Sequence, residues 1–465
     1  MIPVDGFSAR KVAVLGLARS GLATVRALRA GGAAVFAWDD DADRRPAAAD
    51  SGAQVTPLEA MPWAEMAALV LSPGIPLHHP TPHPAVAMAR RHGVEIIGDI
   101  ELFIRNVDAG QVVAITGTNG KSTTTALLGH LLREVGLSVA VGGNLGLPVL
   151  DLPRLDGDGF YVLELSSYQL DLTPSLTCRA ACLLNVTPDH LDRHGGMDGY
   201  IAAKRQIFRA LTDDGVCVVG ANDAPTRATA DTLRAAGQRV VAISAARLPG
   251  DGVFNDANQV TVRHNDQCRT LADRSAATAL PGSHNGQNAA AAAALALDLG
   301  LADADIARGL LSFPGLAHRQ ERIRALNGVA YVNDSKATNA AAAARALACY
   351  TPIYWIAGGR AKDGGITALS AFFPRIRHAY LIGEAARDFA RDLEGHAPYS
   401  LCGALPQAVD QAHHLAQAEH LDGATVLLAP AAASFDQFDS FEARGEVFRQ
   451  QVMALDTDPP REAQA

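Results

Sequence analysis

Residues 112–123 of this chain read Val112-Val113-Ala114-Ile115-Thr116-Gly117-Thr118-Asn119-Gly120-Lys121-Ser122-Thr123. The apolar, β-branched beginning predicts a buried strand, and the segment rich in Ala and Leu that follows predicts a helix. The glycine turn between them lets backbone N–H groups converge on phosphate oxygens at the start of the helix. Lys121 adds a positive charge, and the hydroxyl of Ser122 or Thr123 can ligate Mg²⁺. The stretch predicts a nucleoside-triphosphate site, although Ile115 stands where the strict pattern has Gly.

The composition is typical of an α/β protein with several domains. The chain has 465 residues, a length too great for a single hydrophobic core. Of these residues 48% are hydrophobic and 5% aromatic. A net charge of −9 without a long basic run argues against a nucleic-acid partner. With no signal-type segment and no apolar run of bilayer length, a cytoplasmic protein without membrane insertion is expected. The scattered cysteines are expected to be reduced core thiols, because no second close pair completes a zinc set.

The first residues follow a βαβ pattern. Lys11–Leu15 predicts a strand, a helix follows to about Ala30, and Val35–Trp38 predicts the next strand. Ala18 occupies the place of the second glycine of the dinucleotide fingerprint, so NAD binding is disfavoured. Another nucleotide or phosphate ligand is still compatible with this pattern.

Strands alternating with helices continue along the chain, which predicts mostly parallel sheets covered on both faces. We therefore expect an α/β protein of three domains. They are a Rossmann-like N-terminal domain (1–98), a central P-loop ATPase-type parallel-sheet domain (99–314) and a Rossmann-like C-terminal domain (315–465). A more polar stretch from Ala245 to Ala279 suggests a small β excursion within the central domain.

Polar residues follow two apolar strands of the central domain. Glu164 ends one predicted strand and points toward the crevice where phosphate would lie, so it is a candidate Mg²⁺ ligand. The other strand ends in Asn185-Val186-Thr187-Pro188-Asp189-His190, in which His190 is a candidate metal ligand or general base. A solvated or helix-capping Glu164 and a structural His190 are the alternatives. Lys204, taken alone, is an ordinary helical lysine.

Three polar segments follow strands of the C-terminal domain. In the segment Asn333–Asn339, Asp334 could bind ribose hydroxyls and Lys336 could reach a phosphate. Lys362 lies in a glycine-rich loop and could hold a carboxylate, and Ser434–Phe438 follows the last strand. Each segment alone could be a polar loop or a helix cap. Together with the central domain they predict an active site between domains.

These ordered motifs resemble the Mur ligase family, the ATP-dependent amide-forming enzymes of peptidoglycan precursor synthesis. The resemblance covers nearly the whole chain, and the form of the loop with Ile115 is that of the family. The motifs that carry it are Thr116–Thr123, Gly143-Asn144, Glu164–Ser167, Asn185–Thr187 with Asp189-His190, Gly282–Asn288, His318-Arg319 and Asn333–Asn339. Within the family, Ser434–Phe438 and Phe441–Gly445 resemble the members that add D-glutamate.

The resemblance implies a substrate pair and a reaction. ATP would phosphorylate the alanyl carboxylate of UDP-N-acetylmuramoyl-L-alanine, and the amine of D-glutamate would attack the acyl phosphate and expel phosphate. Phosphorylation turns a poor acyl donor into one with a good leaving group, and Lys121, Mg²⁺ and Lys336 would stabilise the developing charge. We expect a monomer that acts in cell-wall synthesis, with only small molecules as partners.

The resemblance also implies which residues bind ATP and Mg²⁺. Ser122 and Glu164 would hold one Mg²⁺, and His190 would hold a second together with Lys204 carbamylated by CO₂. Catalytic roles are implied for Lys121, Glu164, His190, Lys204 and Lys336. ATP would be bound by Gly117, Thr118, Asn119, Gly120, Lys121, Ser122, Thr123, Asn285, Asn288, Arg319 and Asp334.

Substrate contacts are implied in all three domains. D-glutamate would lie against Thr338, Lys362, Ser434 and Phe441, with Lys362 and the hydroxyls meeting its carboxylates. Asn144 and His190 would lie near the acyl end of the nucleotide substrate. Its UDP end would lie in the first domain, near Arg19, Ser20, Asp39 and Asp40.

Three other functions are compatible with parts of the pattern. Another amide ligase of the superfamily, such as folylpolyglutamate synthase, shares the phosphate loop, but the N-terminal βαβ unit argues against it. A nucleotide switch would hydrolyse ATP or GTP without amide chemistry and would need neither Lys362 nor Ser434. An NAD-dependent oxidoreductase is disfavoured by Ala18.

Overall fold

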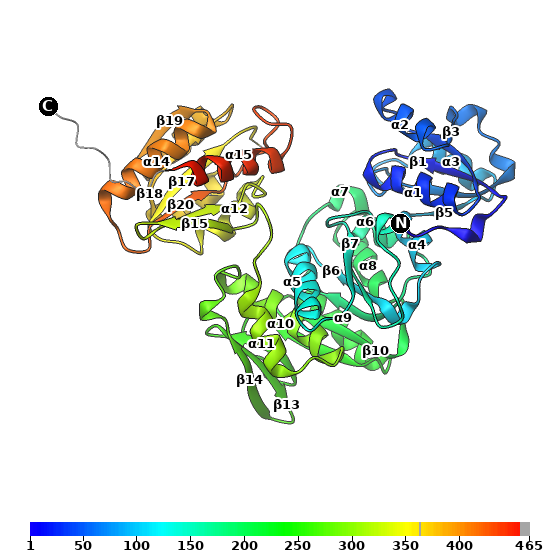
Figure 1. The fold of residues 1–465 in the computed structure, drawn as a ribbon, viewed down its shortest axis with the longest axis horizontal. Coiled ribbons are helices and arrows are strands. Elements are labelled where there is room, and N and C mark those ends of the chain that lie inside the picture. The colour runs from blue at the N-terminus through cyan, green and yellow to red at the C-terminus, as the bar shows by residue number, and fades with distance from the viewer. Residues whose placement is uncertain (362–363, 456–465) are drawn as a thin grey trace. The chain divides into compact units, whose positions relative to one another are not determined.

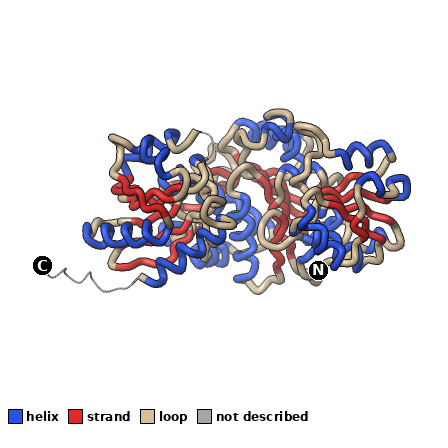
Figure 2. The backbone as a smooth tube through the Cα atoms, turned by 90° about the horizontal axis from the view of Figure 1, so that it is seen from above, coloured by secondary structure: helices blue, strands red, loops and turns tan. Residues whose placement is uncertain are grey.

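The computed structural model describes residues 1–361 and 364–455, and the chain divides into two compact units. Unit 1 comprises Met1–Arg274 and Asn285–Ser312, and unit 2 comprises Ser275–His284 and Phe313–Ala465. Three sheets, mostly parallel, carry helices beside them (Figures 1 and 2). The predicted α/β class is therefore confirmed, while the predicted domain boundaries at residues 98 and 314 stay predictions.

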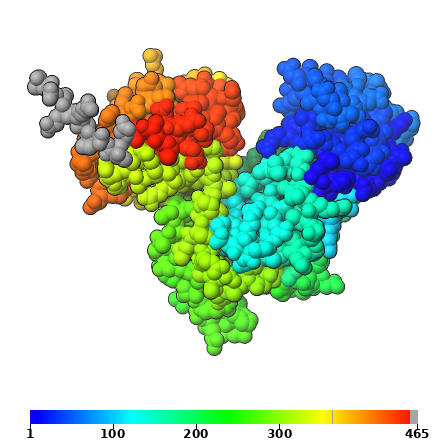
Figure 3. Space-filling model, in the orientation of Figure 1, coloured from blue at the N-terminus to red at the C-terminus, as the bar shows by residue number. Residues whose placement is uncertain are grey.

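The first sheet of unit 1 is entirely parallel and has the order β3-β2-β1-β4-β5. Its strands and helices pack into one contiguous body, blue in Figure 3. The strands are β1 (Lys11–Leu15), β2 (Ala34–Trp38), β3 (Gln54–Val55), β4 (Met66–Leu71) and β5 (Glu95–Ile97). The helices are α1 (Arg19–Ala30), α2 (Arg45–Asp50), α3 (Pro84–Arg91) and α4 (Asp99–Ile104).

The second sheet of unit 1 has the order β14-β13-β12-β11-β10-β9-β6-β8-β7. β12, β13 and β14 pair antiparallel, and β13 and β14 project as a hairpin at the bottom of Figure 1, within the predicted polar stretch. The strands are β6 (Val112–Thr116), β7 (Val139–Gly143), β8 (Phe160–Glu164), β9 (Thr177–Leu183), β10 (Ala210–Gly220), β11 (Val240–Ser244), β12 (Gly252–Asp256), β13 (Gln259–His264) and β14 (Gln267–Asp273). The helices are α5 (Lys121–Glu134), α6 (Ser167–Asp171), α7 (Leu191–His194), α8 (Met197–Arg205), α9 (Ala224–Ala235), α10 (Gly282–Asp298) and α11 (Asp303–Ser312).

The sheet of unit 2 has the order β15-β16-β20-β17-β18-β19 and is parallel except for β15. The strands are β15 (Glu321–Leu326), β16 (Val329–Asn333), β17 (Ile353–Gly358), β18 (Ile376–Ile382), β19 (Tyr399–Gly403) and β20 (Thr425–Leu428). The helices are α12 (Ala340–Leu347), α13 (Ala386–Leu393), α14 (Leu405–Glu419) and α15 (Phe441–Ala454). Among the helices that the structure describes, none has the length and apolar character needed to cross a bilayer.

The sheets are buried on both faces, so side chains from each face contribute to a hydrophobic core. In unit 2 the consecutive residues Tyr354 and Trp355 are both fully buried, yet they belong to different hydrophobic clusters because side chains alternate along a strand. In unit 1 one cluster contains Val14 of the first sheet, Ile100 of α4 and Leu163 of the second sheet. The two sheets of unit 1 therefore share a continuous core.

The close packing of α1 on the end of β1 gives a test of the fold. A Cβ at Gly21 would lie 1.8 Å from the Gly16 carbonyl oxygen, whereas a Cβ at Gly6 would have no neighbour within 4 Å. We expect Gly21→Ala to lower the free energy of unfolding by about 1–3 kcal/mol, as overpacking does. Gly6→Ala should change it by less than about 0.5 kcal/mol. Urea unfolding of both variants measures the difference, and equal effects would contradict this packing.

Candidate active site

The predicted phosphate loop connects β6 to α5, and two of its glycines cannot be replaced without collision. Gly117 and Gly120 have φ angles of 155° and 86°, in the region that favours glycine. A Cβ at Gly117 would lie 2.9 Å from the Leu184 Cβ, and one at Gly120 would lie 2.2 Å from Asn288 Oδ1. The loop therefore needs glycine both for its backbone conformation and for its close approach to α10.

Asn185, two residues after β9, holds the phosphate loop from the neighbouring strand. Its backbone oxygen accepts from Thr118 N at 2.9 Å, and its side-chain Oδ1 accepts from Asn119 N at 2.9 Å. Its Nδ2 donates to the Asn119 carbonyl oxygen at 3.1 Å. Asn185 was quoted in a motif but was not predicted as a site residue, because only the pairing of β9 with β6 reveals this contact.

The predicted nucleotide-binding side chains gather at the start of α5. Lys121 Nζ donates to the carbonyl oxygens of Gly117 and Thr118 at 2.9 and 3.0 Å, and Ser122 is buried in the same turn. From α10, Asn288 Nδ2 donates to Asn285 Oδ1 at 2.9 Å. The Asn288 Oδ1 also accepts from Thr124 Oγ1 at 3.4 Å, so both predicted asparagines lie beside the phosphate loop.

Glu164 lies on the strand next to the loop and has one unsatisfied oxygen. The β8 register places it opposite Ile115 of β6. Its side chain is buried, and Oε1 accepts from Asn144 Nδ2 at 2.7 Å. Its buried Oε2 has no hydrogen-bond partner. A buried carboxylate oxygen without a donor is costly, and a divalent cation would satisfy it. The structure therefore brings together two predicted site residues, Asn144 and Glu164.

Lys204 of α8 is almost fully buried and reaches the phosphate loop. Its Nζ donates to the Gly117 carbonyl oxygen at 2.8 Å and lies 4.6 Å from the centre of the Tyr200 ring. Burial, assisted by the charge of Lys121, lowers the pKa of Lys204 to about 7. Near neutral pH a substantial fraction of this amine is therefore uncharged and nucleophilic.

His190 lies on the segment between β9 and α7. Its backbone is left-handed, with a φ of 50°, and its side chain is half exposed. The imidazole Nε2 lies 3.5 Å from Asp189 Oδ2, and the ring centre lies 5.2 Å from that of Tyr168. Within residues 1–361 and 364–455, no three His, Cys, Asp or Glu side chains form a group that could hold a metal ion. The predicted metal sites, Ser122 with Glu164 and His190 with carbamylated Lys204, stay predictions.

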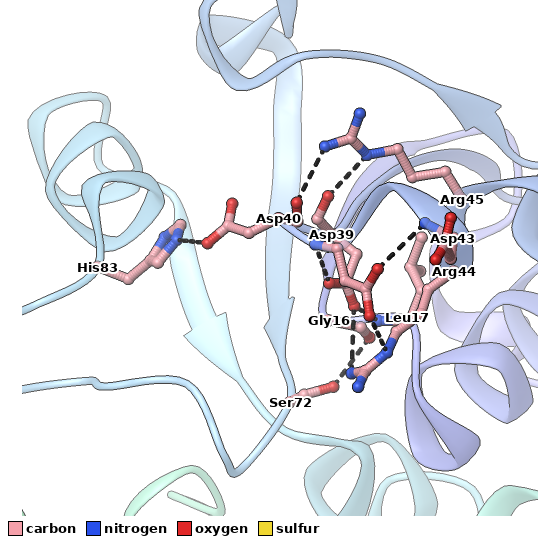
Figure 4. A network of polar contacts seen from close by, with 10 residues as sticks. Gly16, Leu17, Asp39, Asp40, Asp43, Arg44, Arg45, Ser72 and His83 are labelled. Carbon is pink, nitrogen blue, oxygen red and sulfur yellow. Dashed lines mark hydrogen bonds and ion pairs between the residues drawn. The ribbon is translucent and has the colours of Figure 1, made fainter.

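A cavity of about 370 Å³ opens at the carboxyl edge of the first sheet. Of the residues predicted there, it is lined by Ser20, Asp39 and Asp40. Asp39 is held in place by two backbone donors. Its Oδ2 accepts from Leu17 N at 2.6 Å (Figure 4), and its Oδ1 accepts from Asp41 N at 2.9 Å. Arg19, the remaining predicted residue, instead donates to the Gly146 carbonyl oxygen of the second sheet's β7–β8 connection at 2.7 Å.

Two arginines beside this cavity were not predicted as site residues. Arg44 lines the cavity, with NH1 3.8 Å from Asp39 Oδ2. Arg45 lies over the Trp38 ring at 3.7 Å and donates to the Asp39 carbonyl oxygen at 2.8 Å. They supply positive charge next to Asp39. In the sequence, their position directly after the acid-rich segment 39–43 could have indicated a role at this cavity.

The predicted residues of unit 2 lie at the carboxyl edge of its sheet. Asp334 follows β16 and is buried, and burial raises its pKa to about 7 although Arg319 and the Gln320 N–H oppose this. Lys336 Nζ lies 4.7 Å from the centre of the Phe441 ring, so these two predicted residues are adjacent. Thr338 follows in the same loop and is half-buried.

Arg444 of α15 ties the loops of unit 2 together. It is fully buried, and its guanidinium donates to Ser335 Oγ at 3.0 Å, to the Ser335 carbonyl oxygen at 2.9 Å and to the Ala432 carbonyl oxygen at 3.2 Å. The loop with Lys336 and the loop with buried Ser434 are thus fixed to one side chain. A helical arginine carries no sequence signal of this role. Lys362 lies outside the described residues.

Family models and full-length relatives match this chain. Residues 10–98 match the Mur ligase MurD-like N-terminal domain, and residues 115–296 match the Mur ligase middle domain. A UDP-N-acetylmuramoylalanine--D-glutamate ligase of Caulobacter vibrioides is 52% identical over 462 residues, covering 98% of both chains. The chain belongs to the Mur ligase family. A ligase of the same name from Paramagnetospirillum magneticum is 50% identical over 456 residues, covering 98% of this chain and 99% of the relative.

Solved Mur ligase structures share the fold. MurF from Acinetobacter baumannii superposes with a TM-score of 0.60 at 20% identity, covering 91% of each chain. UDP-N-acetylmuramate-alanine ligase MurC from Thermotoga maritima superposes with a TM-score of 0.58 at 17% identity, covering 96% of this chain and all of that one (100%). The predicted membership of the Mur ligase family is confirmed, and the chain is a ligase.

Two glycines that flank α5 in this Mur ligase allow the effect of a steric collision to be distinguished from the effect of backbone strain. Gly120 and Gly136 both have positive φ, 86° and 81°, but only a Cβ at Gly120 meets a neighbour within 4 Å. We expect Gly120→Ala to weaken ATP binding at least about tenfold, because displacing Asn288 disturbs the loop. Gly136→Ala should bind ATP normally. Isothermal titration calorimetry compares them, and unchanged affinity in Gly120→Ala would refute a phosphate role for this loop.

Proposed function

We propose that this Mur ligase joins D-glutamate to UDP-N-acetylmuramoyl-L-alanine and converts ATP to ADP and phosphate. The observation that carries this proposal is the 50–52% identity, over nearly the whole chain, to relatives named for that reaction. The segment Ser434–Phe438, which follows a loop held by Arg444 at the Ala432 carbonyl, adds support for the D-glutamate branch. The protein acts as a cytoplasmic monomer on small-molecule substrates.

The reaction activates a carboxylate before the amide forms. An oxygen of the alanyl carboxylate attacks the γ-phosphorus of ATP, the bond to the β–γ bridging oxygen breaks, and ADP leaves. The amine of D-glutamate then attacks the acyl carbon, and phosphate departs from the tetrahedral intermediate while the amine loses a proton. Lys121, at the N-terminus of α5, is placed to meet the charge on the transferring phosphoryl group.

Glu164 and Ser122 fit a Mg²⁺ ion. The buried, unpartnered Oε2 of Glu164 needs a cation or a donor, and hydroxyl and carboxylate oxygens are the ligands that Mg²⁺ prefers. Mg²⁺ bound there would neutralise phosphate charge during transfer. Asn144, which donates to Glu164 Oε1, orients the carboxylate and lies where the acyl end of the nucleotide substrate is proposed to bind.

Lys204 is proposed to carry a carbamate that serves, with His190, a second Mg²⁺. Its neutral Nζ attacks the carbon of CO₂, an N–C bond forms, and a proton leaves the nitrogen. The carbamate replaces a buried cation by an anionic oxygen ligand. A lysine at this position could therefore serve as a metal ligand. Burial of Lys204 next to the cationic Lys121 supports this modification, because both effects favour loss of its positive charge.

Lys204→Arg tests the carbamate, because guanidinium keeps the charge and does not add CO₂. We expect ligase turnover to fall at least about 100-fold, as for a lost metal ligand. In ¹³C-bicarbonate buffer, wild-type protein should show a carbamate carbon signal by NMR that disappears in Lys204→Arg. Lys11→Arg, at a surface lysine paired with Glu65, should keep both signal and turnover. A signal that survives in Lys204→Arg would contradict the assignment.

The nucleotide and amino-acid substrates are proposed to bind at separate sheet edges. The cavity lined by Ser20, Asp39 and Arg44 would take the UDP end, with Asp39 and Asp40 accepting hydrogen bonds and Arg44 facing the diphosphate. In unit 2, Thr338, Lys362, Ser434 and Phe441 would hold D-glutamate. Asn285, Asn288, Arg319 and Asp334 would hold the remainder of ATP.

The deciding experiment measures phosphate release and amide product with ATP, Mg²⁺ and UDP-N-acetylmuramoyl-L-alanine, with and without D-glutamate. We expect release only with both substrates and Mg²⁺, and little activity with L-glutamate, L-alanine or diaminopimelate. Product formed from another amino acid would move the protein to another branch of amide ligases. Hydrolysis independent of both substrates would favour a nucleotide switch instead.

A further inference from the structure

Two loops of unit 1 that serve different parts of the proposed site are joined by one side chain. Arg193, in α7, follows the segment that carries His190. Its NH1 donates to the Gly74 carbonyl oxygen at 3.0 Å, and Gly74 lines the cavity of the first sheet. The arginine therefore bridges the His190 segment to the wall of the cavity, across 119 positions of sequence.

Tyr168 completes the bridge. The Arg193 guanidinium lies 4.7 Å from the centre of the Tyr168 ring, in the range of a cation–π contact. The same ring lies 5.2 Å from the His190 ring on a tilted approach. Tyr168 belongs to α6, which begins three residues after Glu164. Arg193, Tyr168 and His190 thus form one packed chain of side chains that begins at the cavity wall.

Neighbouring contacts support a close fit of these two regions. A Cβ at Gly195 would lie 2.8 Å from His79 Nε2, so the segment after Gly74 packs directly on the end of α7. Arg19 makes the reciprocal link, from α1 to the Gly146 carbonyl oxygen in the loop that also holds Asn144. Two cavity-side elements, α1 and the loop at residues 72–75, are therefore bonded to segments that carry Asn144 and His190.

We infer that Arg193 is a positioning residue that couples occupation of the first-sheet cavity by a nucleoside diphosphate to the placement of His190. This inference rests on the proposed function, in which UDP fills that cavity and His190 serves the reacting end. A ligand that orders the loop at residues 72–75 holds the Gly74 carbonyl, Arg193 then keeps its contact with the Tyr168 ring, and His190 is held against the same ring. Arg193 acts through its contacts with the Gly74 carbonyl and the Tyr168 ring, which makes it a positioning residue rather than a catalytic one.

Hydrogen exchange with UDP as the probe tests the coupling without turnover. In the full-length wild-type protein, UDP should slow exchange in peptides covering residues 70–78 and residues 186–196. In Arg193→Ala it should slow exchange only in residues 70–78. Arg26→Ala is the matched control, because Arg26 of α1 also links the two sheets of unit 1, through Asp151 at 2.7 Å, but touches neither loop. It should keep both effects.

Kinetics give a second readout that a merely structural role would not produce. We expect Arg193→Ala to lower kcat about tenfold, with the KM for ATP unchanged. Tyr168→Leu should lower it similarly, and the double variant should be no worse than either alone. Tyr168→Phe, which keeps the ring, should retain most activity. Arg193→Lys should recover little, since a compact ammonium group does not replace the planar guanidinium that contacts both the Gly74 carbonyl and the Tyr168 ring.

The outcomes separate the inference from the function on which it rests. UDP protection of residues 70–78 alone in the wild type, or protection of residues 186–196 that persists in Arg193→Ala, overturns the coupling but leaves the UDP site intact. Equal losses in Arg193→Ala and Arg26→Ala also overturn it, because they would reflect general loosening of unit 1. No protection of residues 70–78 overturns the proposed nucleotide site and the coupling with it.

Discussion

The phosphate loop keeps its shape because a neighbouring strand satisfies its backbone. A loop that follows a central strand is not paired with neighbouring strands, so its N–H and C=O groups need other hydrogen-bond partners. Asn185 supplies them by accepting from Thr118 N and Asn119 N and donating to the Asn119 carbonyl. With the loop fixed, the Gly117 carbonyl becomes the point on which the amines of Lys121 and Lys204 converge.

That convergence sets the electrostatics of the site. The amines of Lys121 and Lys204 both lie within hydrogen-bond distance of this one carbonyl oxygen, and burial, assisted by the charge of Lys121, lowers the pKa of Lys204. Nearby, Glu164 is buried with one oxygen unsatisfied. The candidate site therefore combines positive charge at the phosphate loop with a buried carboxylate that has one unsatisfied oxygen. A protein with a net charge of −9 can thus bind highly anionic substrates through local arrangement.

Much of the fold was predictable from local patterns. The strand–turn–helix reading at residues 112–123 and the strands Lys11–Leu15, Val329–Asn333 and Thr425–Leu428 agree with the structure. Short or edge strands such as β5, β7 and β19 were not predicted, because two or three apolar residues at a sheet edge resemble a loop. The antiparallel β15 was also missed. Five of its six residues are exposed or half-exposed, so it lacks the apolar run of a buried strand.

Candidate site residues that lie close together in the sequence could be predicted. Those whose role depends on contacts with distant parts of the chain could not. The residues of the phosphate loop, together with Glu164, His190 and Asp334, lie at or just after the ends of predicted strands. That position made them candidates from the sequence. Arg444 and Arg193 were not singled out, because their partners Ser335 and Gly74 are remote in sequence. Their roles depend on which loops lie beside their helices.

By itself, the amino-acid sequence determined the α/β class, the phosphate loop and the membership of a ligase family, because strand periodicity, glycine turns and ordered motifs are local properties. Only the tertiary structure decided that Asn185 holds the loop, that Lys204 is buried against Gly117, and that Arg193 reaches Gly74. Those facts depend on strand order and helix packing, which bring together side chains that the sequence keeps far apart.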